Sequence, residues 1–69
     1  MDPTATLRQI FEQYQNCEYE DAFYSCIELE KWVSGGGFLP DAYSRKIGQL
    51  EIMGFLSVMK AECKRASVA

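Results

Sequence analysis

The fold depends most on residues 41–65, which read DAYSRKIGQLEIMGFLSVMKAECKR. At about 100° per residue, this segment carries two opposed apolar stripes if it forms one α-helix. The first stripe contains Tyr43, Ile47, Leu50, Gly54, Val58 and Ala61. The second contains Ile52, Leu56, Met59 and Cys63. Because one stripe is enough to dock a helix onto its neighbours, the second predicts a surface that another molecule covers.

Two segments nearer the N-terminus have the same helical periodicity. In residues 3–16 the apolar side chains recur at Leu7, Ile10, Phe11 and Tyr14. In residues 18–34 they recur at Tyr19, Ala22, Phe23, Cys26, Leu29 and Val33. Asp2 before Pro3 is a typical helix start, and the three glycines at 35–37 favour a helix end. The sequence therefore predicts helices over about 3–16, 18–34 and 41–65, and leaves open whether the third continues through Gly54.

We expect one all-α domain over residues 1–69, in which an antiparallel hairpin of the first two helices packs against a longer third helix. The expected core contains Leu7, Ile10, Phe11, Tyr14, Tyr19, Ala22, Phe23, Cys26, Leu29, Val33, Leu39, Tyr43, Ile47 and Leu50. The second stripe, Ile52, Leu56, Met59 and Cys63, then predicts self-association, most simply as a two-fold homodimer. A 69-residue domain buries only about 60% of its unfolded surface, so a second copy would also stabilise it.

Residues 17–22, CEYEDA, resemble the turn and second-helix start of a tetratricopeptide repeat, where an aromatic residue, two acids and a small alanine recur at similar spacing. The resemblance covers one hairpin, roughly residues 7–34. Ile10 and Phe11 stand where the family has a small residue, and the proline after the second helix comes late, behind the glycines. The resemblance implies an antiparallel helical hairpin and no binding residues, since one unit cannot form the groove that several repeats make.

Composition and charge narrow the function. With 48% hydrophobic and 25% charged residues, the chain is typical of a globular domain. Its net charge of −3 and pI near 4.7 argue against a protein that coats nucleic acid. The charge is uneven, because residues 1–40 carry a formal −5 and residues 41–69 a formal +2. Lys60, Lys64 and Arg65 near the end of the third segment support the alternative of a nucleic-acid-binding regulator.

No pattern of catalytic or metal-binding residues stands out. The chain has no histidine, and its three cysteines, Cys17, Cys26 and Cys63, lack the spacing of a structural zinc site. The glycines at 35–37 match no phosphate-binding loop motif. We therefore expect no enzyme activity, metal, cofactor or small-molecule substrate. An odd number of cysteines and the lack of a signal peptide or membrane-spanning run favour a cytoplasmic protein without membrane contact.

Two aromatic residues lie outside the main stripe of the second predicted helix. Trp32 and Tyr24 are candidate anchors for a partner, because these residue types are enriched at interface hot spots. The alternative for Trp32 is packing on Phe38 and Leu39 over the glycine loop. Taken together, the sequence predicts a small non-enzymatic interaction module, an adaptor or regulator, that binds itself and an unidentified protein.

Overall fold

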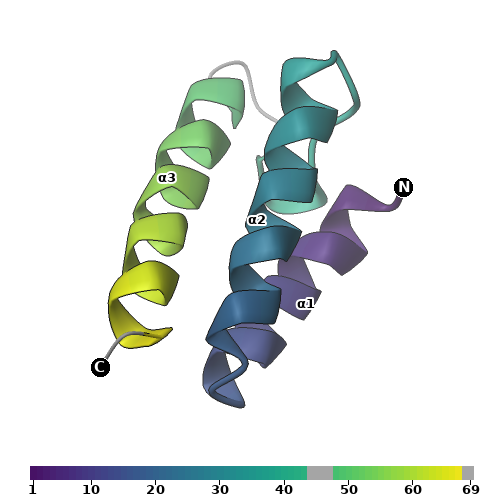
Figure 1. Cartoon of the computed structure of the whole chain (residues 1–69). Helices are drawn as coiled ribbons and strands as arrows, with labels where there is room; N and C mark the ends of the chain where they lie inside the picture. The colour runs from purple at the N-terminus through teal and green to yellow at the C-terminus, as the bar shows by residue number, and fades with distance from the viewer. Residues whose placement is uncertain (44–47, 68–69) are drawn as a thin grey trace.

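The computed structural model describes residues 1–43 and 48–67, and every regular element within these ranges is helical. The elements are α1 (Pro3–Gln15), α2 (Tyr19–Ser34), a short 3-10 helix η1 (Asp41–Tyr43) and α3 (Gly48–Ser67), as Figure 1 shows. The prediction of an all-α chain with three α-helices is confirmed for this part. In the same ranges, no helix has the length and apolar character needed to cross a membrane. Ile47, one of the expected core residues, lies outside them.

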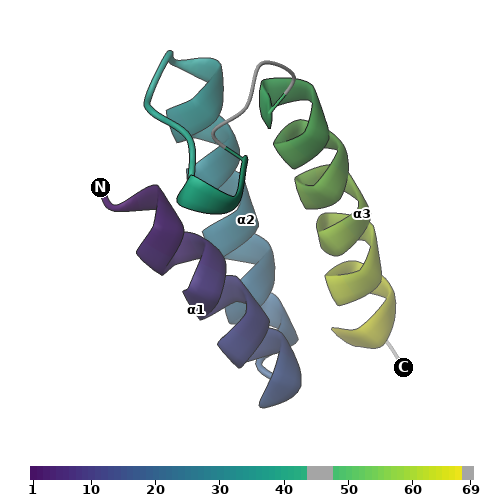
Figure 2. The same ribbon diagram turned by 180° about the vertical axis from the view of Figure 1, so that it is seen from behind.

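Helix α2 is the central element of the fold, because α1 and α3 both pack against it. In Figures 1 and 2 the chain descends along α1, returns along α2 and descends again along α3. The molecule measures 37 × 18 × 18 Å. It is therefore about twice as long as it is wide.

The start of α1 follows the sequence pattern. The Asp2 carboxylate accepts hydrogen bonds from the backbone N–H groups of Thr4 and Ala5, at 3.1 and 3.2 Å. Pro3 occupies the first turn, where its missing N–H costs nothing. After α1, Cys17 adopts a left-handed conformation with φ of 61°, which reverses the chain within three residues. The N-terminus of α1 is capped as predicted.

The beginning of α3 differs from the prediction, which placed one helix over 41–65. Residues 41–43 form η1 instead, and α3 begins at Gly48. A Cβ atom at Gly48 would lie 1.6 Å from the Tyr43 carbonyl oxygen, so only glycine permits this approach. The Thr4 hydroxyl also accepts a hydrogen bond from the Asp41 N–H at 3.0 Å, which ties η1 to α1. Beyond Gly48 the helix is continuous through Gly54.

The hydrophobic core lies where the three helices meet. Its fully or nearly buried apolar residues are Leu7, Ile10, Ala22, Cys26, Leu29, Val33, Ile52, Leu56 and Cys63. The six from α1 and α2 are among the predicted core residues. Tyr14, Tyr19, Phe23, Leu39 and Tyr43 are only partly buried.

The assignment of the two stripes of α3 is wrong. Ile52, Leu56 and Cys63 are completely buried, and Met59 packs partly buried against the core, so this stripe cannot serve as an exposed self-association patch. The first stripe, expected in the core, faces outward: Leu50 is 79% exposed and Val58 61%.

The start of α3 explains the exchange of the stripes. With the helix beginning at Gly48, Tyr43 is no longer on it, and the first stripe as the structure describes it contains Leu50, Gly54, Val58 and Ala61. Glycine and alanine offer little apolar area to bury, whereas the second stripe consists entirely of larger side chains. Burying the second stripe therefore removes more apolar area from water.

Candidate functional site

The first candidate site is the outer face of α3, which we define as Leu50, Gly54, Ser57, Val58 and Ala61. All five residues are exposed, and none is charged. At Gly54, a Cβ atom would meet nothing within 4 Å. An uncharged, mostly apolar strip on an exposed helix is typical of an interface core, where charged residues are depleted.

An aromatic edge links α3 with α1. The Phe11 and Phe55 ring centroids lie 5.5 Å apart, and the Tyr43 and Phe55 ring centroids lie 6.3 Å apart. Phe11 was expected in the core but is 46% exposed. The reason is that α1 and α3 pack mainly on α2 rather than on each other, which leaves this ring covered from one side. The edge supplies further exposed apolar area between the two helices.

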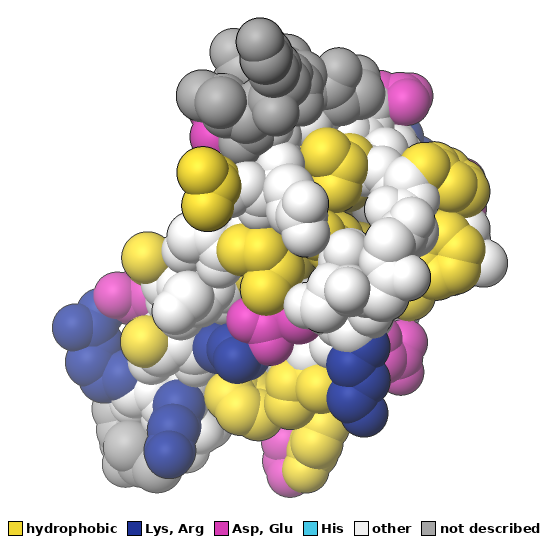
Figure 3. All heavy atoms as spheres, turned by 90° about the horizontal axis from the view of Figure 1, so that it is seen from above, with side chains coloured by type: hydrophobic (Ala, Val, Ile, Leu, Met, Phe, Trp, Pro, Cys, Tyr) yellow, Lys and Arg dark blue, Asp and Glu magenta, His cyan; other side chains and the backbone are white. Residues whose placement is uncertain are grey.

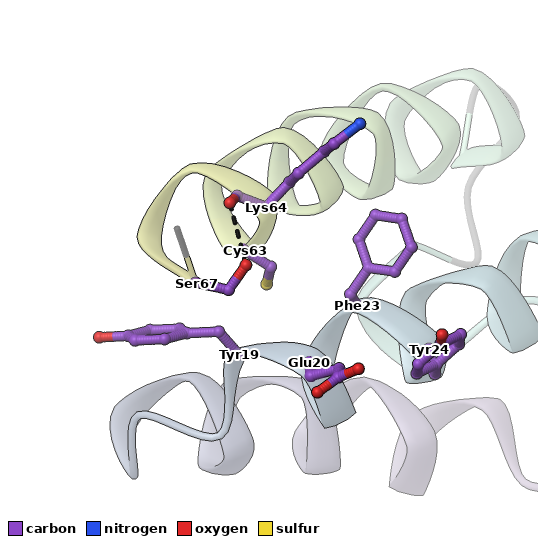
Figure 4. A pocket seen from close by; sticks show the side chains of 7 residues that line it. All are labelled: Tyr19, Glu20, Phe23, Tyr24, Cys63, Lys64 and Ser67. Carbon is purple, nitrogen blue, oxygen red and sulfur yellow. Dashed lines mark hydrogen bonds between the residues drawn. The ribbon is translucent and has the colours of Figure 1, made fainter. Parts of the chain in front are cut away.

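The second candidate site is an open pocket of about 460 Å³ between α2 and α3. Its lining residues are Tyr19, Glu20, Phe23, Tyr24, Cys63, Lys64 and Ser67. Figure 4 shows Phe23 rising from α2 toward the Lys64 side chain, with Tyr19 and Tyr24 at opposite ends. Tyr24 is 58% exposed, and its ring meets that of Phe23 edge to face at 5.9 Å. Tyr24, a candidate anchor, therefore lies at one end of a pocket whose lining includes three aromatic side chains and one lysine side chain.

Trp32, the other candidate anchor, interacts with the loop that follows its own helix. Its indole N–H donates a hydrogen bond of 2.8 Å to the Phe38 carbonyl oxygen, and the two rings meet edge to face at 5.5 Å. Gly37 lies so close that a Cβ atom there would be 2.3 Å from the indole ring. Trp32 therefore packs on Phe38, one of the two contacts of the loop-packing alternative.

The cysteines are free thiols, with Cys17 exposed and Cys26 and Cys63 buried. Burial, together with the nearby Cys63 and Glu30, raises the pKa of Cys26 to about 12. Burial also raises the pKa of Cys63. Both buried thiols are therefore protonated at neutral pH, which makes them poor nucleophiles and poor metal ligands. Within residues 1–43 and 48–67, no three histidine, cysteine or acidic side chains are grouped as a metal site would require.

The basic end of α3 is largely paired with carboxylates. Lys60 Nζ lies 2.7 Å from Glu30 Oε1 on α2, and Arg65 forms an ion pair with Glu62 on its own helix. Figure 3 shows the same mixture, with basic side chains beside acidic ones in the lower half of the view. Lys64 lines the pocket. The three basic residues of the nucleic-acid alternative thus do not form one uncompensated positive surface.

Sequence reasoning missed the outer face of α3 and the Glu30–Lys60 pair. The small residues Gly54 and Ala61 were the signal for the outer face, because they offer little apolar side-chain area to bury in a core. Glu30 and Lys60 lie on different helices, and the sequence does not show how these helices align. No local sequence pattern could therefore predict their ion pair.

These features define a three-helix domain with an exposed apolar helix face and an aromatic pocket. Comparisons with protein families, with characterised proteins and with solved structures find no match for the chain.

Proposed function

We propose that the protein is a small non-enzymatic interaction module, an adaptor or regulator, that self-associates through α3. The observation that carries this proposal is the exposure of Leu50 (79%) and Val58 (61%) on one face of a single helix. Covering both side chains would gain stabilisation of roughly 25 cal/mol for each Å² of apolar surface removed from water. In this arrangement α1 and α2 form an antiparallel hairpin that supports α3, and a second copy covers the outer face.

A role without catalysis is supported by the chemistry of the titratable groups. The chain has no histidine, and the raised pKa of Cys26 keeps that thiol protonated. Tyr24, exposed beside the pocket of α2 and α3, is the proposed anchor for a second protein partner.

Light scattering coupled to size exclusion tests the self-association. We expect the wild-type chain to elute as a dimer, and Leu50→Glu and Val58→Glu to elute as monomers, because each places a carboxylate in an apolar contact. The matched control is Gln49→Glu, which adds the same charge at an exposed neighbouring position outside the outer face. This variant should remain a dimer. A wild-type monomer at the highest soluble concentration, or dimers in all three variants, would contradict the proposal.

A further inference from the structure

We draw no further inference here: the strongest candidate, the open pocket between α2 and α3, is lined by the opposite charges of Glu20 and Lys64 beside its aromatic side chains, and nothing in the structure shows what would occupy it.

Discussion

At the scale of single residues, the end of α2 shows how closely one side chain and one glycine depend on each other. The Trp32 ring lies where a Cβ atom at Gly37 would be, and its N–H is bonded to the Phe38 carbonyl oxygen. The three glycines at 35–37 were read from the sequence as a helix end. The structure adds that Gly37 is needed for space, whereas Gly36 is needed for its backbone, with φ of 89°.

We predict that Gly37→Ala destabilises the protein by about 1–3 kcal/mol, because the new methyl group must displace the indole ring and break its hydrogen bond. Chemical denaturation measures the change. The control is the same substitution in a Trp32→Leu background, where the ring is absent and the methyl group costs much less. An equal loss of stability in both backgrounds would show that Trp32 is not what excludes the side chain.

At the scale of helices, the sequence predicted which segments are helical but not which face of α3 is buried. Periodicity identified α1 and α2 within one or two residues, because their capping residues and glycines are local signals. The start of α3 depends on the contact between Gly48 and Tyr43, which local reasoning does not contain. One residue of the wrong stripe, Tyr43, lies in η1 and not on α3, and counting it as part of the third helix made that stripe look larger than it is.

The Glu30–Lys60 ion pair joins α2 and α3 at the edge of their contact. Its side chains are 18% and 31% exposed, so water screens the pair less than it screens a fully exposed one. We predict a coupling energy of about 1 kcal/mol in a double-mutant cycle of Glu30→Gln and Lys60→Gln, the upper part of the range for surface pairs.

The pair of Glu62 and Arg65 is the matched control for that cycle. It lies within one helix, and the Arg65 side chain is 74% exposed, so its coupling should be only about 0.3 kcal/mol. The reversed pair Glu30→Lys with Lys60→Glu should recover most of the stability that either single reversal loses. Equal coupling in the two pairs would contradict the prediction that partial burial strengthens the Glu30–Lys60 pair.

At the scale of the whole molecule, the sequence predicted an apolar surplus on the third helix but assigned it to the wrong face. This excess of apolar surface arises because α1 and α3 both pack on α2. The side of α3 that faces away from α2 is then uncovered, whichever of its two stripes is buried. Periodicity gives the number of stripes, whereas the choice between them depends on the areas that each can bury against α2. The pocket between α2 and α3 was beyond sequence reasoning for the same reason, since it depends on the register of two helices.

If the chain self-associates as we propose, a domain of this size should gain measurable stability from a second copy. If folding and self-association are linked, a tenfold rise in protein concentration stabilises each chain of a dimer by about 0.7 kcal/mol, which is half of RT ln 10. For a domain of this length we therefore expect the Tm to rise by about 3–5 °C for each tenfold rise in protein concentration, measured by circular dichroism.

The control is Val58→Glu, in which the Tm should not change with protein concentration, even if its absolute value differs from that of the wild type. The change of Tm with protein concentration, rather than the Tm itself, reports on the outer face of α3. A substitution that only weakens the fold lowers the Tm equally at every concentration. A wild-type Tm that stays constant over the whole range would mean that the chain folds alone and that Leu50 and Val58 remain in contact with water.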